Sequence, residues 1–121
     1  MKHCLIVEDS DVIRKVAAQL LKDLTFESSE AENGQLALDQ CSTRMPDAIL
    51  LDRTLPIVSG LEFLASLRAQ PGGEKPVIIY CTTENDPKDI ARALAAGADE
   101  YILKPYDRDT IKAKFAEAGL I

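Results

Sequence analysis

Hydrophobic and polar positions alternate along the chain between two kinds of segment. Short, mainly apolar runs typical of buried strands occupy residues 3–8, 48–52, 77–83 and 100–104, and a weaker run occupies residues 26–31. Each run precedes a segment with apolar residues at helical spacing: residues 11–24, 34–43, 61–70, 86–97 and 107–118. This repeated strand–helix order predicts an α/β fold, a doubly wound parallel sheet with helices on both faces.

Two of the predicted helices have clear signals at their ends. Ser10 or Asp11 is expected to cap the first helix. The pair Asn33-Gly34 predicts a turn into the second helix, whose inner face should carry Leu36, Ala37 and Cys41.

The length and composition predict one globular domain over residues 1–121. Hydrophobic residues make up 46% of the chain and charged residues 28%. The net charge of -6 disfavours nucleic acid and anionic membrane surfaces as partners and favours docking of a basic segment. No apolar run is long enough to cross a membrane and no secretory leader is visible, so we expect a cytoplasmic protein.

The cysteines and the one histidine are not predicted to carry chemistry. Cys4, Cys41 and Cys81 are odd in number, form no CxxC pair and lie in apolar segments, which predicts buried, reduced thiols. His3 should be inert, because the amino end of the first strand lies at the wrong edge of the sheet.

Polar residues collect where the predicted strands end. Glu8 and Asp9 follow the first strand, Asp52 ends the third, and Lys104 follows the fifth. The fourth strand ends at Thr82 and Thr83. Because ligands of parallel sheets bind at the carboxyl ends of the strands, we expect these groups to share one rim.

The residue types at this rim suit phosphoryl transfer. Neighbouring carboxylates raise one another's pKa and therefore favour a bound cation. Oxygen donors with open water positions suit Mg²⁺, which in turn binds phosphate. Lys104 and Thr82 would bind phosphoryl oxygens, and Asp52 would be the nucleophile of an in-line transfer. The alternative is that Asp52 only starts the turn that follows it.

Four short motifs carry a resemblance to a known family. The motifs "VEDS", "LLD" followed by "LPIVSG", "TTE" and "KPY" occur in this order at the ends of the first, third, fourth and fifth strands. Together they resemble the receiver domains of two-component response regulators, particularly the stand-alone CheY-like type. The resemblance implies a flavodoxin-like (βα)5 fold with strand order 2-1-3-4-5.

The resemblance also implies a function and partners. A histidine kinase or histidine phosphotransferase would donate a phosphoryl group, and a downstream protein would dock on the face built from residues 86–97, 100–104 and 107–118. A monomer is expected, and dimerisation on phosphorylation stays open.

Individual roles follow from the resemblance, residue by residue. Asp52 would be the phosphoacceptor, Asp9 a direct Mg²⁺ ligand and Glu8 a ligand through water. The backbone carbonyl of Thr54 would be a further ligand. Lys104 would bind the phosphoryl group, and the peptide bond between Lys104 and Pro105 is expected to be cis.

The resemblance further implies a switch and a set of residues that tune it. Thr82 would supply the switch hydroxyl, and Tyr101 the aromatic ring that moves with it. The chain departs from the usual pattern at Thr83, where a smaller residue is common, at Ser59-Gly60, where Asp-Gly is usual, and at Tyr106, where Phe is usual. We expect access to the phosphoryl group, or its lifetime, to be tuned by Arg53, Thr54, Thr83 and Glu84.

Structural alternatives remain at several positions. Glu8 and Asp9 are alternatively solvated acids at a helix start. Thr82 and Tyr101 are alternatively ordinary strand residues. Arg53 is expected to be a solvated loop residue.

Two alternative functions remain open. One is a phosphorylation-independent adaptor that binds a protein or an anionic second messenger through Arg53, Arg92 and Arg108. The other is a flavodoxin-like redox or hydrolytic enzyme. The chain lacks both a Gly-rich phosphate loop after the first strand and a Ser-His-Asp set, which disfavours this second alternative.

Overall fold

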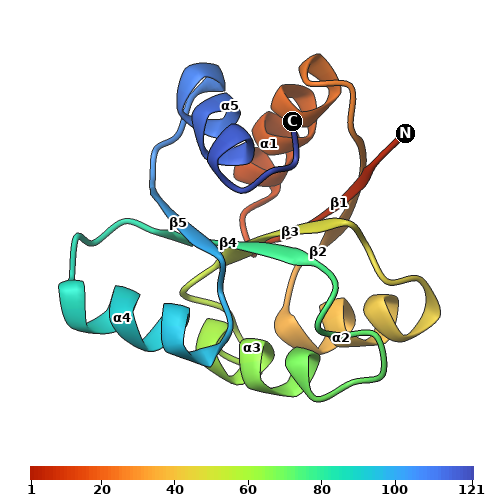
Figure 1. The fold of residues 1–121 in the computed structure, drawn as a ribbon, viewed down its shortest axis with the longest axis vertical. Helices are drawn as coiled ribbons and strands as arrows, with labels where there is room; N and C mark the ends of the chain where they lie inside the picture. Colours follow the sequence, from red (N-terminus) through yellow and green to blue (C-terminus); the bar gives the residue numbers. More distant parts are fainter.

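The computed structural model describes residues 1–121 and contains five strands and five helices in strict alternation (Figure 1). The elements are β1 (His3–Val7), α1 (Asp11–Asp23), β2 (Glu27–Ala31), α2 (Gly34–Thr43), β3 (Ala48–Asp52), α3 (Gly60–Arg68), β4 (Val77–Thr82), α4 (Pro87–Ala96), β5 (Glu100–Leu103) and α5 (Arg108–Glu117). Every predicted element is present, with ends that differ by at most two residues from those predicted.

The strands form one parallel sheet in the order β2-β1-β3-β4-β5, which confirms the predicted flavodoxin-like fold. Helices α1 and α5 cover one face of the sheet, and α2, α3 and α4 cover the other (Figure 1). The order reverses between β1 and β3, because the chain moves to one side of β1 for β2 and to the other side for all later strands. In such sheets this reversal is where ligands bind.

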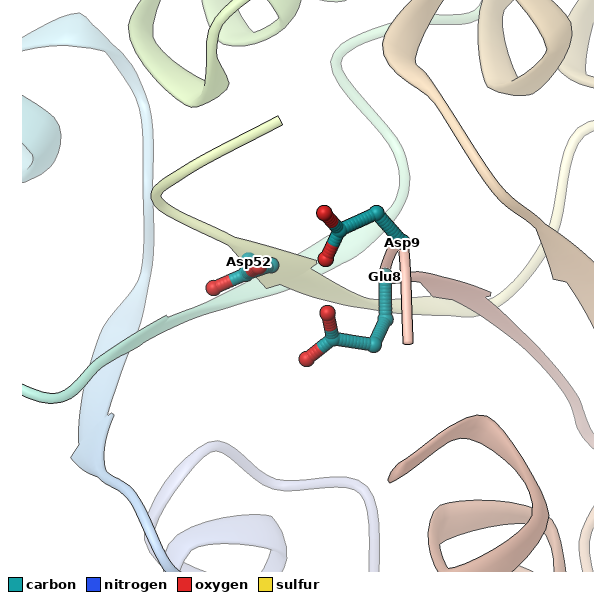
Figure 2. Close-up of side chains that lie close together, drawn as sticks. All are labelled: Glu8, Asp9 and Asp52. Atoms are coloured by element: carbon teal, nitrogen blue, oxygen red, sulfur yellow. The ribbon is translucent and has the colours of Figure 1, made fainter. Parts of the chain in front are cut away.

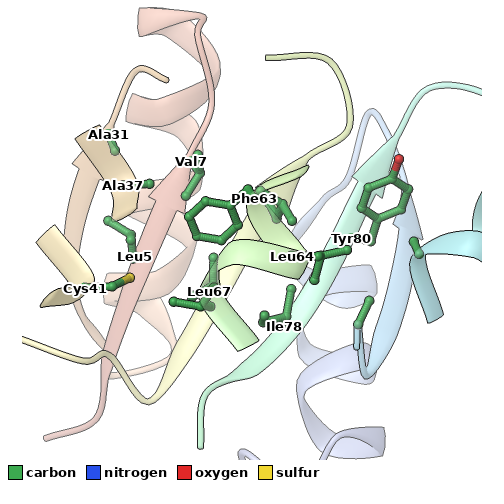
Figure 3. Close-up of a cluster of buried hydrophobic side chains, with 14 residues drawn as sticks. Leu5, Val7, Ala31, Ala37, Cys41, Phe63, Leu64, Leu67, Ile78 and Tyr80 are labelled. Carbon is green, nitrogen blue, oxygen red and sulfur yellow. The ribbon is translucent and has the colours of Figure 1, made fainter. Parts of the chain in front are cut away.

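Alternate residues of the central strands fill two separate cores. Ile49 packs toward α2, α3 and α4. Leu5 and Tyr80 lie in the same core, together with Phe63 of α3 (Figure 3). On the opposite face, residues such as Ile6, Leu50, Ile79 and Phe115 pack with α1 and α5. Strands β1 and β3 are buried along their whole length, as expected of parallel strands covered on both faces.

The weak signal of the second strand has a simple structural cause. β2 lies at the edge of the sheet and pairs only with β1, so Glu27 and Glu30 can stay exposed. Phe26, just before this strand, packs edge-to-face against Phe115 with ring centroids 5.1 Å apart. The edge strand is therefore held in place mainly by its backbone hydrogen bonds to β1 and by the neighbouring aromatic pair, since Ala31 is its only buried apolar residue.

The apolar spacing of two helices overstated their burial. Leu36 was predicted on the inner face of α2, but it is 42% exposed. Ala37 and Cys41 are buried as predicted, and Leu38 packs against the same core. Val12 and Val16 match the helical spacing of α1, yet they are 71% and 48% exposed. Each helix touches the sheet along a stripe narrower than its apolar pattern.

Other local predictions are confirmed. Ser10 is the residue that caps α1, because its hydroxyl accepts a hydrogen bond from the backbone N–H of Ile13. Cys4, Cys41 and Cys81 are free and buried. Burial raises the pKa of Cys4 to about 12 and that of Cys41 to about 11, so these thiols stay protonated at neutral pH.

His3 is a buried residue at the amino end of β1, and its Nε2 lies 2.8 Å from Ser29 Oγ. Burial lowers the pKa of this imidazole.

None of the five helices combines the length and the apolar character that a membrane span requires.

Candidate functional site

Three carboxylates meet where the sheet order reverses. The register places Val7 of β1 beside Leu51 of β3, so the residues that follow, Glu8 and Asp52, emerge next to each other. One carboxylate oxygen from each of Glu8, Asp9 and Asp52 lies within 4.8 Å of the other two. Figure 2 shows how the three side chains converge. Glu8 and Asp52 are 44 positions apart in the sequence, so the fold brings distant acids together. Their predicted convergence is therefore present in the structure.

Lys104 brings the fifth strand into the same group. Its Nζ lies 2.5 Å from Glu8 Oε1 and 3.1 Å from Asp52 Oδ1, and all three side chains are at most 10% exposed. Burial opposes the charge of this ammonium, but the hydrogen bonds and charges of Glu8 and Asp52 outweigh burial and raise the pKa of Lys104. The lysine is therefore charged and fixed over the carboxylate of Asp52. The peptide bond that follows it, to Pro105, is cis as expected.

Asp9 is the one solvent-exposed acid of the three. It is exposed, whereas Glu8 and Asp52 are buried. A hydrogen bond with the Glu8 side chain, partial burial and the negative charge of Glu8 all raise the pKa of Asp9. Mutual repulsion of this kind is relieved by a cation, and an oxygen-only donor set suits Mg²⁺. The residues at this rim therefore fit the predicted metal, and Thr54 lies on the exposed turn just after Asp52.

Thr82 ends β4 and is 1% exposed. Its Oγ1 accepts a hydrogen bond from the backbone N–H of Glu84 at 3.1 Å and donates to the backbone carbonyl of Glu84 at 3.4 Å. The hydroxyl predicted to switch is thus engaged by the loop between β4 and α4. The neighbouring Thr83 is exposed and, with Tyr106 among others, lines an apolar hollow of about 340 Å³ beside Lys104.

Arg53 is not the solvated loop residue that we expected. Its side chain is 32% exposed, and its guanidinium pairs with Glu84 at 2.9 Å and with Asp89 at 3.2 Å. The hydrogen bond to Glu84 raises the pKa of Arg53 further. Asp89 is buried in the first turn of α4, where it also accepts a hydrogen bond from the Tyr80 hydroxyl at 3.0 Å.

Sequence reasoning missed Asp89 and Tyr80. A usable signal existed, because a tyrosine inside a fully apolar strand needs a partner for its hydroxyl, and the next helix offers an acid in its first turn. Burial and the hydrogen bond to Asp89 raise the pKa of Tyr80, which keeps this hydroxyl a donor.

Tyr101 is half-buried in β5, and the ammonium of Lys114 lies 4.7 Å from the centroid of its ring. Lys114 also pairs with Glu100 at 3.2 Å. This position is compatible with both readings of Tyr101, as a strand aromatic and as a ring that moves, so its role as a switch stays a prediction.

A comparison with protein families narrows the alternative functions left open by the geometry. The model of the response regulator receiver domain matches residues 4–116. The chain therefore belongs to the response regulator receiver family. Receivers are the signalling domains of two-component systems, and this membership favours the phosphoacceptor reading over a redox or hydrolytic enzyme.

Individual relatives agree with this assignment. The chain is 34% identical over 113 residues to the phosphate regulon transcriptional regulatory protein PhoB of Klebsiella pneumoniae, covering 93% of this chain and 49% of that protein. The receiver thus spans about half the length of the PhoB relatives it matches.

Solved structures show the same fold. The chemotaxis response regulator CheY4 of Vibrio cholerae superposes with a TM-score of 0.92 at 29% identity, covering 98% of each chain. The receiver domain of the sensor histidine kinase PA1611 from Pseudomonas aeruginosa, also 29% identical, superposes with a TM-score of 0.85 over 93% of this chain and 92% of that one. That structure holds a magnesium ion coordinated in its active site cleft.

The arginines named for the adaptor alternative do not form a free basic patch. Arg53 is paired with two carboxylates, and Arg108 is paired with Asp23 at 2.9 Å. Arg92 is exposed on α4. Two of the three guanidinium groups would have to break ion pairs before they could bind an anion.

Proposed function

We propose that this receiver accepts a phosphoryl group on Asp52 from the phosphohistidine of a histidine kinase or phosphotransferase, in the presence of Mg²⁺. The observation that carries the proposal is the buried Asp52 carboxylate, held 3.1 Å from the Lys104 ammonium beside two further acids. A carboxylate oxygen of Asp52 forms a bond to phosphorus while the bond from phosphorus to the imidazole nitrogen breaks. The nitrogen keeps the electron pair and takes up a proton.

The acids at the rim would hold the metal. Asp9 and Asp52 would bind Mg²⁺ directly, Glu8 would bind it through water, and the carbonyl of Thr54 would complete the protein ligands. The bound ion supplies charge neutralisation for the phosphoryl oxygens. The convergence of the three carboxylates supports this assignment, as does the magnesium ion in the cleft of the Pseudomonas aeruginosa receiver.

Lys104 and Thr82 would bind the remaining phosphoryl oxygens. The ammonium already faces Asp52, whereas the Thr82 hydroxyl is bonded to Glu84 and must turn to reach a phosphoryl group. This turn, with a movement of Tyr101, would convert phosphorylation into a change of the face formed by α4, β5 and α5. Arg53, Thr54, Thr83 and Glu84 surround the route of the attacking water and would set the lifetime of the phosphoryl group.

The output would be docking of a target protein on the α4-β5-α5 face. We propose that residues 1–121 form one receiver domain that acts as a monomer, in the cytoplasm with its kinase. Self-catalysed hydrolysis of the aspartyl phosphate would return the domain to its resting form, so its role is that of a phosphoacceptor rather than of an enzyme acting on other substrates.

Phosphorylation of variants tests the assignment of Asp52. The wild type, Asp52→Asn and the control Asp39→Asn are incubated with a small phosphoryl donor and MgCl2, and intact mass is measured. Asp39 is an exposed acid on α2, so its replacement removes one charge without touching the rim. We expect the wild type and the control to gain one phosphoryl group and Asp52→Asn to gain none. Full labelling of Asp52→Asn would show that another residue is the acceptor.

A further inference from the structure

We propose that Arg53 is a latch: its ion pairs with Glu84 and Asp89 hold the loop between β4 and α4, and with it Thr82, in the unphosphorylated arrangement. The inference rests on the proposed function, because it concerns how the phosphoryl site communicates with α4. It assigns a positioning role to a residue that directly follows the phosphoacceptor in the chain.

The backbone of Arg53 is held in place by two hydrogen bonds, directly after Asp52 in the chain. Its N–H donates to the carbonyl of Cys81 at 2.9 Å, and its carbonyl accepts from the N–H of Gly60 at 3.3 Å. Only the side chain extends away from this anchored position, toward Glu84 and Asp89. A displacement of either acid therefore has to break a contact with a guanidinium that cannot follow it far.

Glu84 is held in two ways in the resting structure. Its carboxylate pairs with Arg53, while its backbone N–H and carbonyl both bond to the Thr82 hydroxyl. For Thr82 to donate a hydrogen bond to a phosphoryl oxygen on Asp52, its hydroxyl must leave the carbonyl of Glu84. The Arg53 pair opposes that change, because it keeps Glu84 where the resting hydrogen bonds need it.

Asp89 extends the latch to helix α4. Its side chain is 9% exposed, and its carboxylate forms an ion pair with the Arg53 guanidinium and accepts a hydrogen bond from the Tyr80 hydroxyl. A buried carboxylate needs such partners, so a movement of the first turn of α4 away from Arg53 would be unfavourable. The more exposed pair with Glu84 should contribute less, because solvent screens it. The two pairs together favour the resting state over any state in which α4 has shifted.

If Arg53 acts as this latch, removal of its ion pairs should favour binding of a phosphoryl mimic. Beryllofluoride with MgCl2 serves as the probe, and its affinity is measured by titration of the ¹⁵N-labelled protein. We expect Arg53→Gln to bind about fivefold more tightly than the wild type, because less of the resting state has to be displaced. Glu84→Gln should show a smaller gain. Arg53→Lys, whose single ammonium can pair with one acid at a time, should fall between Arg53→Gln and the wild type.

A matched control separates the latch from a general loss of positive charge. Arg44→Gln breaks the ion pair between Arg44 and Glu27, at the amino-terminal edge of β2, and should leave the affinity unchanged. A second readout needs no ligand: in Arg53→Gln without beryllofluoride, the amide signal of Glu84 should move toward its position in the beryllofluoride-bound wild type. Denaturant unfolding confirms that each variant is folded.

The outcomes distinguish the latch from the proposed function. Equal affinity of the wild type and Arg53→Gln, or an unmoved Glu84 amide, would overturn the latch alone. Weaker binding by Arg53→Gln would also overturn it and would mean that Arg53 contacts the phosphoryl group instead. A wild type that does not bind beryllofluoride would overturn the proposed function, and the latch with it.

Discussion

At the scale of single residues, Lys104 is the group on which the electrostatic balance of the rim depends. Its ammonium lies between the buried carboxylates of Glu8 and Asp52, and no other cation pairs with either acid. Without it, two negative charges would face each other in a poorly solvated place. Lys104 thus acts as the counter-ion of both acids in this structure.

Replacement of Lys104 should therefore destabilise the protein in metal-free buffer. We expect Lys104→Met to lower the free energy of unfolding at pH 7 by about 3 kcal/mol, the usual loss when a buried charge is left without its partner. The measurement is urea unfolding in EDTA, with Lys75→Met, an exposed loop lysine, as the control. A loss no larger than that of the control would mean that water already screens these carboxylates.

The raised pKa of Lys104 gives the same interaction a pH signature. A group whose folded-state pKa is raised contributes stability that is present below its ordinary pKa of 10.5 and is lost as the pH rises through the higher folded value. Wild-type stability should therefore fall more steeply above pH 10.5 than that of Lys104→Met. Parallel stability curves for the two proteins in this range would contradict the assigned ion pairs.

Most of the site residues were predictable because each stands at the end of a strand. Glu8, Asp52 and Lys104 interrupt apolar runs, and the edge rule for parallel sheets then places them together. The partners of Arg53 were not predictable in the same way. Whether its guanidinium reaches Asp89 or water depends on side-chain direction and on the position of α4, neither of which is encoded in a local pattern.

At the scale of elements, periodicity predicts which segments are helices or strands but not how much of each is covered. The exposure of Val12 and Val16 on α1 shows this limit, because the same apolar spacing fits both a buried stripe and one that extends into solvent. The edge position of β2 explains why a polar segment still forms a strand. Burial of a face is a property of the packed neighbours as well as of the element itself.

Helix α3 shows how an element can be tied to the site through a single residue. Gly60 begins this helix, and a Cβ atom there would lie 2.9 Å from the backbone oxygen of Asp52 and 3.1 Å from that of Arg53. Backbone atoms cannot rotate away as a flexible side chain can. The start of α3 can therefore approach the turn after Asp52 only because residue 60 has no side chain.

Substitution of Gly60 should consequently affect both stability and phosphorylation. We expect Gly60→Ala to lower the free energy of unfolding by about 2 kcal/mol through overpacking and to slow labelling of Asp52, because the turn must shift. The control is Gly72→Ala, where φ is +79° and a Cβ would meet nothing within 4 Å. It should lose about 1 kcal/mol from its left-handed backbone and keep normal labelling. Equal labelling rates for Gly60→Ala and the wild type would mean that the position of the start of α3 does not affect phosphorylation of Asp52.

At the scale of the whole molecule, the topology is what joins distant segments into one site. The hydrogen bond between Lys104 and Glu8 spans 96 residues of chain and exists only because β1, β3, β4 and β5 are adjacent in this order. Alternation of elements predicts the parallel sheet, but many strand orders satisfy it. The order 2-1-3-4-5 was available from the resemblance to receivers, whereas the physical reason for it lies in packing across the whole sheet.

The charge of the whole molecule allows a sharp test of the metal proposal. With a net charge of -6, any salt should stabilise the fold slightly by screening, so a specific Mg²⁺ site must be separated from screening. At Mg²⁺ about tenfold above its dissociation constant, binding to the folded state adds about 1.4 kcal/mol, which corresponds to a rise in Tm of about 5 °C.

The comparison uses thermal unfolding of the wild type and Asp9→Asn in MgCl2 and in NaCl of equal ionic strength. We expect the wild type to respond to MgCl2 well beyond its response to NaCl. Asp9→Asn should respond equally to both salts, because it lacks a direct ligand. In EDTA this variant should be slightly more stable than the wild type, since the raised pKa of Asp9 shows that its charge is unfavourable next to Glu8. A wild type that cannot distinguish the two salts would mean that the three carboxylates do not form a Mg²⁺ site, whatever their spacing.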